Sequence, residues 1–248
     1  MEVHHHPKPE KKPFKEYFLE FLMIFLAVTM GFFAENLRER MVNHETEKSF
    51  MESLVQDLKD DKSTITQQQQ VFDQRVILLD SLIMMLDATP VTANTNDLYY
   101  YGRLATKSQL FTGNTRTIEQ MKSTGGFKLI RNRKVTEAML SYYAILEEIR
   151  NLESQGGEEG EMNEYRKLAV QIFNADVFNR INSAGLNNVS RPTENPPLRT
   201  NDPKLRGDLA GWVHYLKNTR IGIYQFKKEL VKKGEDLVRL IGEEYHLD

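Results

Sequence analysis

The chain has 248 residues, of which 40% are hydrophobic and 27% charged, as in an ordinary folded protein rather than a disordered one. Its 33 basic and 35 acidic residues nearly cancel, which argues against a bulk positive field that recruits nucleic acid. There is no cysteine, and this excludes disulfides, thiolate metal sites and cysteine nucleophiles.

The segment from Phe18 to Ala34 is far more apolar than the rest of the chain, and it carries no charge after Glu20. A helix on a soluble protein shows a polar stripe, whereas this segment is apolar all round. Counted from Tyr17, it reaches the roughly 17 residues that a transmembrane helix needs at least. The sequence therefore predicts a membrane anchor at residues 17–36. A buried core helix and a cleaved signal peptide are the alternatives, and AENLRER lacks the small-residue cleavage signature of the latter.

Residues 1–16 are predicted to be a short basic cytoplasmic tail. Four lysines precede the anchor, and three basic residues follow it closely: Lys8, Lys11, Lys12 and Lys15 against Arg38, Arg40 and Lys48. The positive-inside rule favours a cytoplasmic N-terminus for this distribution. We therefore expect a single-pass protein whose C-terminal domain is extracytoplasmic.

The anchor has two further features. Glu20 is costly in hydrocarbon unless it faces a partner or water, but costs little at the headgroup level beside Tyr17. Apolar side chains recur at alternating spacings of four and three, at Phe14, Phe18, Phe21, Phe25, Val28 and Phe32. This spacing predicts either a coiled-coil seam for self-association or a lipid-facing aromatic surface. The expected partners are membrane lipid and a second copy or another membrane protein.

No proline lies between Pro13 and Pro90, and Gly31 is the only glycine there, so the anchor helix is predicted to continue to about residue 88. Its apolar positions keep helical spacing, at Phe50, Leu54, Leu58, Ile65, Phe72, Val76, Leu79, Ile83 and Leu86. The stretch DLKDDKSTITQQ, from Asp57, lacks the glycine and the final glutamate of a calcium loop. We interpret it as a solvated helix face.

The remaining chain reads as helices over about 97–124 (short), 133–155, 161–183 and 203–246. Asn132 and Asp202 are predicted N-caps, with Pro203 at the first helical position, and Gly125 is a predicted left-handed C-cap. The terminal helix has a seam at Leu209, Trp212, Leu216, Ile223, Phe226, Leu230, Leu237 and Ile241, and glycines that allow close approach at Gly211, Gly222, Gly234 and Gly242. This seam predicts a long antiparallel partner, of which the first helix is the obvious candidate. No β-alternation occurs. The predicted fold is all-α, with one N-terminal transmembrane helix continuing into a long helix that packs in an extramembrane helical bundle.

Motifs of catalysis are missing: there is no Gly-rich phosphate loop, no His-Glu-x-x-His and no Gly-x-Ser-x-Gly. Glu147, Glu148 and Glu153 offer paired carboxylates, but the downstream histidines are isolated from them. No catalytic, cofactor-binding or metal-binding residue is therefore predicted. The strongest charged cluster, a candidate contact for lipid headgroups or an acidic partner or else a solvated turn, comprises Lys128, Arg131, Arg133 and Lys134.

Two blocks of the sequence resemble a family together. The first is EYFLEFLMIFLAVTMGFFAENLRER followed by ESLVQDLKDD, and the second is RTIEQMKSTGGFKLIRNRKVTEAMLSYY. The chain resembles, over about its first 150 residues, a family of uncharacterised single-pass membrane proteins of Bacteroidota. The matching positions are Leu54, Asp57, Leu58, Asp61, Thr117, Met121, Lys122, Ser123, Gly125, Tyr142 and Tyr143. The resemblance implies a membrane anchor and an all-α domain, and it assigns no catalytic residues. Together with the lysine distribution, it leads us to expect a protein of a bacterial inner membrane whose C-terminal domain is periplasmic.

These observations favour a membrane-anchored, non-enzymatic helical scaffold or assembly subunit that forms oligomers. One alternative is an extracytoplasmic sensor-like module that binds a small molecule near Tyr99–Tyr101 and Trp212 and acts through a partner. A weaker alternative is an ion-conducting oligomer lined partly by Glu20 and Glu35.

Overall fold

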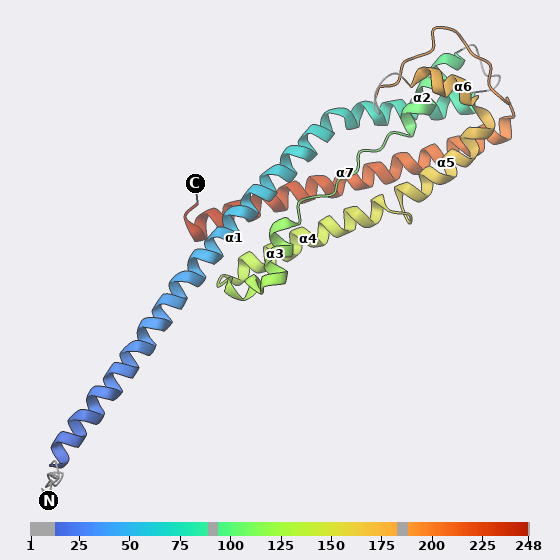
Figure 1. Cartoon of the computed structure of the whole chain (residues 1–248). Coiled ribbons are helices and arrows are strands. Elements are labelled where there is room, and N and C mark those ends of the chain that lie inside the picture. Colours follow the sequence, from blue (N-terminus) through green and yellow to red (C-terminus); the bar gives the residue numbers. More distant parts are fainter. Residues whose placement is uncertain (1–12, 89–93, 183–187, 248) are drawn as a thin grey trace, which may run out of the picture. The chain divides into compact units, whose positions relative to one another are not determined.

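A computed structural model describes residues 13–88, 94–182 and 188–247 (Figure 1). Residues 1–12 of the predicted cytoplasmic tail therefore lie outside the described residues. The described chain forms α1 (Phe14–Asp87), α2 (Thr95–Ala105), α3 (Arg116–Thr124), the 3-10 helix η1 (Gly126–Leu129), α4 (Arg133–Glu153), α5 (Glu158–Ile172), α6 (Ala175–Ile181) and α7 (Pro203–Tyr245). The described residues contain no strand, only one isolated bridge between Asn182 and Val189. The all-α prediction is confirmed.

The first part of α1, up to Phe50, belongs to a compact unit of its own. It contains an 18-residue window with a mean hydropathy of 2.0, none of which is buried. Its large apolar side chains are exposed on every side of the helix, as in Phe21 (63% exposed) and Val28 (68% exposed). Among the described residues, α1 is the one helix long and apolar enough to cross a membrane.

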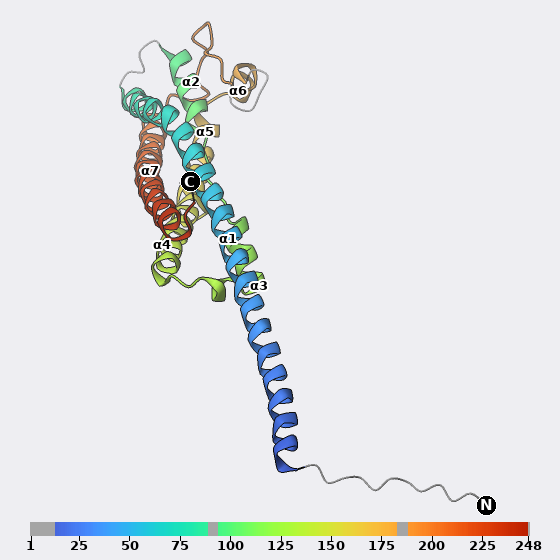
Figure 2. The same cartoon turned by 90° about the vertical axis from the view of Figure 1, so that its left-hand side faces the viewer.

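The second unit begins at Met51 and is a helical bundle. Here α7 runs along α4 and α5 (Figure 1, Figure 2). It also lies antiparallel to α1, because Lys62 pairs with Glu235 at 2.7 Å while Lys217 pairs with Asp80 at 2.6 Å. The first helix is thus one of the partners of α7, as its seam predicts.

The bundle core consists largely of the predicted apolar stripes. Fully or nearly fully buried members from α1 and α7 include Leu54, Leu58, Ile65, Leu79, Leu86, Leu209, Leu216, Ile223, Leu230, Leu237 and Ile241. On α7, Trp212 and Phe226 are only half-buried. Removal of one such side chain from water contributes about 1.5–3 kcal/mol, so the stripes are the main source of the stability of the bundle.

The predicted helix ends are confirmed. The side chain of Asn132 accepts a hydrogen bond from Lys134 N at 2.9 Å, and that of Asp202 accepts one from Lys204 N at 2.9 Å. Gly125 ends α3 in the left-handed conformation, with φ 73°. Each cap satisfies a backbone group that the helix itself leaves open.

The helix expected over 161–183 is instead two helices, α5 and α6. The backbone is extended at Phe173 (φ −101°, ψ 143°). The amide of the next residue, Asn174, donates to the hydroxyl of Tyr99 at 2.9 Å instead of to α5. That tertiary hydrogen bond ends α5, and no local sequence pattern encodes it.

Of the glycines expected to permit close approach, Gly234 does so. A Cβ at Gly234 would lie 3.2 Å from Cε2 of Tyr142, whereas Gly211 and Gly222 face open space. Gly234 therefore lets α4 and α7 approach at the level of Tyr142.

Candidate functional site

Residues 106–115, which connect α2 to α3, have no regular secondary structure and cross the bundle beside α4 and α7 (Figure 1). Side chains of the helices satisfy much of their backbone. Phe111 N donates to Glu153 at 3.0 Å, and the Leu110 carbonyl accepts from Gln68 at 3.1 Å. Because a buried backbone needs such partners, the connecting segment is held in one path. Two polar clusters lie beneath it.

The first cluster is a carboxylate clamp formed by Asp57, Asp61, Asn114, Thr117 and Tyr142. Asp57 accepts from the Thr117 hydroxyl at 2.6 Å and from the Thr117 amide at 3.2 Å. Asp61 accepts from the Asn114 amide at 2.9 Å and from the Tyr142 hydroxyl at 2.7 Å. The clamp thereby joins α1 to the connecting segment, α3 and α4.

Both carboxylates are 3% exposed, so the interpretation as a solvated helix face was wrong for Asp57 and Asp61, whereas Lys59, Lys62 and Ser63 are exposed. Burial raises the pKa of Asp61, against the lowering effect of its hydrogen bonds from Tyr142 and Asn114. Burial, with Asp61 nearby, also raises the pKa of the Tyr142 hydroxyl, which therefore remains a neutral donor. Carboxyl groups that each accept several hydrogen bonds hold the fold in place and have little capacity left for a substrate.

The clamp brings together residues from both blocks of the family resemblance, which lie far apart in the sequence. Asp57 and Asp61 come from the first block, and Thr117 and Tyr142 from the second. Tyr143, the neighbour of Tyr142, has a buried hydroxyl without a hydrogen-bond partner among the described residues. The motif thus has a structural role in this chain, since its polar members fix the connecting segment to the long helix.

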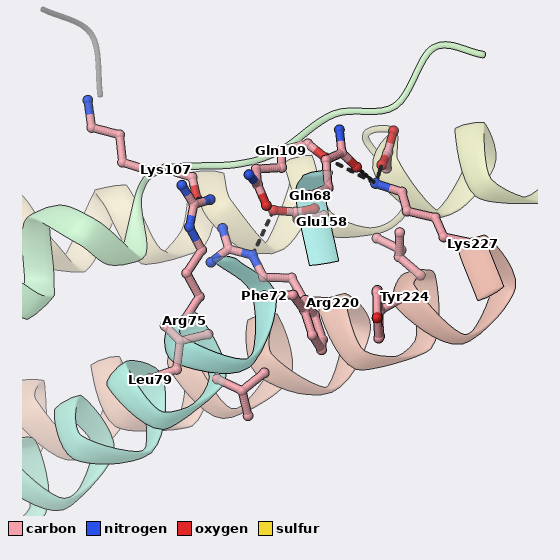
Figure 3. Close-up of a pocket in the computed structure, with 13 residues that line it drawn as sticks. Gln68, Phe72, Arg75, Leu79, Lys107, Gln109, Glu158, Arg220, Tyr224 and Lys227 are labelled. Atoms are coloured by element: carbon pink, nitrogen blue, oxygen red, sulfur yellow. Dashed lines mark hydrogen bonds and ion pairs between the residues drawn. The ribbon is translucent and has the colours of Figure 1, made fainter. Parts of the chain in front are cut away.

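The second cluster surrounds a cavity between α1, the connecting segment, the end of α4, α5 and α7 (Figure 3). Lys227 on α7 is almost fully buried in its wall. Its ammonium group donates to Glu153 at 2.9 Å, to Gln68 at 3.0 Å and to the Gln109 carbonyl at 3.1 Å. These bonds use the three donors of the ammonium group, so Lys227 has no donor left for a ligand.

Arg220, about two helical turns before Lys227 on α7, is also largely buried. It donates to Glu158 at 2.8 Å and to the Ala105 carbonyl at 3.1 Å, and the two charged side chains are 11% and 8% exposed. Ser108 donates to the same Glu158 oxygen at 2.8 Å. Breaking a buried pair of this kind costs about 3–5 kcal/mol, because one charge is left uncompensated.

Arg75 on α1 also lines the cavity. It donates to the Lys107 carbonyl at 3.0 Å, and this is its one hydrogen bond within the described part of the chain. Figure 3 shows its guanidinium group close to that of Arg220, beneath the segment that carries Lys107 and Gln109. The cavity measures about 50 Å³. A volume of this size holds a few waters or one small ion and is far below the several hundred Å³ of a typical organic-ligand site.

Sequence reasoning missed this cavity, although a signal was present. The seam of α7 steps from Leu216 to Ile223 and from there to Leu230, and the intermediate inner positions are Arg220 and Lys227. Two cations at core positions of an apolar stripe indicate buried partners. Glu147, Glu148 and Glu153, which the sequence offers as paired carboxylates, do not form one group in the structure, because Glu153 pairs with Lys227 while the other two are exposed.

The predicted basic cluster lies on exposed surface at η1 and the start of α4: Lys128, Arg131, Arg133 and Lys134. Arg133 forms an exposed ion pair with Glu137 at 2.7 Å. Asn132, in the middle of the cluster, donates to Glu244 of α7 at 2.6 Å. Contact of this cluster with lipid or with a partner stays a prediction.

The other predicted residues divide into two groups. The anchor positions are all exposed on α1: Phe18, Glu20, Phe21, Phe25, Val28 and Phe32. Tyr99, by contrast, is fully buried, and its hydroxyl donates to the Pro197 carbonyl at 2.9 Å. Tyr101 and Trp212 pack against the same core. Tyr99 is therefore a core residue and does not offer a face to a ligand.

No known family model, curated protein or solved structure matches the chain. The relation to the membrane-protein family stays a prediction that rests on the quoted motifs.

Proposed function

We propose that the protein is a membrane-anchored, non-enzymatic scaffold or assembly subunit that self-associates through the aromatic stripe of α1. The observation that carries this proposal is that no described part of the chain buries the window of α1 that is apolar all round. Exposed apolar surface of this extent needs lipid or a partner. The charged groups in the interior of the bundle, in contrast, pair mainly with one another, which favours a structural role for the bundle.

Self-association can be tested by cross-linking, because the chain has no cysteine of its own. Phe25→Cys and Val28→Cys place a single thiol on the proposed seam. Met23→Cys and Met30→Cys place it on the opposite side of the same helix, at 3.6 residues per turn, and serve as matched controls. We expect oxidation in native membranes to give disulfide-linked dimers from the two seam variants only.

Equal absence of dimers from all four variants, together with a monomer by light scattering in mild detergent, would contradict the scaffold proposal. Dimers from the Met23 and Met30 positions alone would move the interface to the other face and leave the aromatic stripe to lipid.

The proposal also places the bundle in the periplasm of a Gram-negative cell, with the anchor in the inner membrane. It is supported by the excess of lysine before the anchor. Glu148→Cys puts one exposed thiol on α4. We expect a maleimide that cannot cross the inner membrane to label this thiol in intact cells; labelling only after lysis would invert the orientation.

A further inference from the structure

The cavity beneath the connecting segment has more cationic than anionic side chains around it. Arg75, Lys107, Arg220 and Lys227 line it, together with only two carboxylates. Lys227 and Glu153 neutralise one another at 2.9 Å. The remaining carboxylate, that of Glu158, pairs with Arg220.

Arg75 is therefore a cation without a carboxylate of its own within ion-pair distance in the described chain. Its guanidinium group has five N–H donors, and the Lys107 carbonyl accepts from one nitrogen only. Arg220 uses two of its three nitrogens, for Glu158 and the Ala105 carbonyl. Several donors of both guanidinium groups are left for a ligand.

The electrostatics of the pair agree with this geometry. Burial, and then the charge of Arg220, lower the pKa of Arg75, while Glu158 opposes this shift. Two guanidinium groups that repel one another in a partly buried site gain stability from an anion between them. Guanidinium is also the side chain whose planar fork matches carboxylate and phosphate oxygens.

We propose that this cavity binds one small oxyanion, a carboxylate or a phosphate group, between Arg75 and Arg220. Its volume of about 50 Å³ is sufficient for an ion of that size. The bound anion bridges α1 to α7 beneath the connecting segment. Anion binding therefore affects α1, α7 and the connecting segment together. It does not depend on whether the chain self-associates.

The test uses the full chain in a nonionic detergent at neutral pH. Inorganic phosphate and acetate are titrated separately by isothermal calorimetry, with sodium chloride at equal ionic strength as the blank, and ³¹P line width gives a second readout for phosphate. We expect saturable binding of at least one of the two anions. Arg75→Gln should weaken it at least tenfold. Arg239→Gln, which removes an exposed guanidinium paired with Asp236, should leave it unchanged.

The acetate and phosphate arms distinguish the two sources of the oxyanion. If circular dichroism shows that Arg75→Gln does not fold, Arg75→Lys keeps the charge but loses the bidentate fork, and it should also bind more weakly. Absence of saturable binding to the wild-type protein would overturn the proposal. So would anion binding unaffected by either change at Arg75.

Discussion

The helix α1 contains two regions that differ in the burial of their apolar side chains. From Phe14 to Val42 nearly all its large apolar residues are exposed, on all sides of the helix. From Met51 onward they form a stripe, and Leu54, Leu58 and Leu79 on this stripe are almost completely buried. The backbone is the same in both regions, and only the pattern of side chains differs.

The two regions therefore differ in what can bury their apolar side chains. A stripe with helical period can be buried by neighbouring helices of the same chain. A helix that is apolar all round presents no polar side to water, and the described residues do not bury the first region of α1. Its burial by lipid or by a partner is part of the function proposed above. The two regions should accordingly respond differently to the same substitution.

The largest difference is expected for truncation of leucine. Leu54→Ala should lower the free energy of unfolding of the bundle by about 2–5 kcal/mol, because it leaves a cavity in a closely packed core. Leu26→Ala, in the exposed region, should leave it unchanged. Denaturation of the full chain in detergent, followed by circular dichroism, measures both. Similar losses for the two variants would mean that the first region is covered by the chain itself.

A charge introduced into each region should also have different effects in the two regions. Phe25→Arg should reduce membrane integration, because an arginine at the centre of a transmembrane helix costs about 2.5–3.5 kcal/mol. Ile77→Arg places the same charge on an exposed site of the bundle part of α1 and should change stability by no more than about 0.5 kcal/mol. Alkaline extraction of membranes gives the integrated fraction of each. A Phe25→Arg protein that stays fully integrated would argue against the anchor.

A smaller and pH-dependent effect is expected within the bundle, at the carboxylate clamp. The fold disfavours ionised Asp61, so its contribution to the free energy of unfolding falls as pH rises from the ordinary pKa of 3.8 through the raised pKa of the folded state. Tyr142→Phe removes a hydrogen bond that lowers this pKa. The fall should then continue to higher pH, and the variant should lose about 1–3 kcal/mol once Asp61 is ionised.

Denaturation curves of the wild-type protein and Tyr142→Phe at a series of pH values from 4 to 8 measure this effect. The difference between the two removes the contribution of Glu161, whose pKa burial also raises. A difference that is constant over the whole series would show that Asp61 does not titrate against Tyr142.

Local residue patterns were sufficient to predict the helical class, the apolar helix and most helix ends. Each of these depends on residues close together in the chain. Asn132 and Asp202 cap helices whose first amides lie two residues away, and Gly125 needs only its own backbone freedom. The stripe of α7 was readable because its period reflects a single helix.

The burial of particular polar residues, and the partners that they bind, became apparent from the tertiary structure alone. Asp57 and Asp61 look solvated in the sequence, and their donors, Thr117 and Tyr142, follow some 60 and 80 positions later. The same is true of Arg75 and Arg220, which meet because α1 and α7 run antiparallel. Burial of a charge depends on partners that the fold supplies from distant parts of the chain, and local sequence carries no measure of that distance.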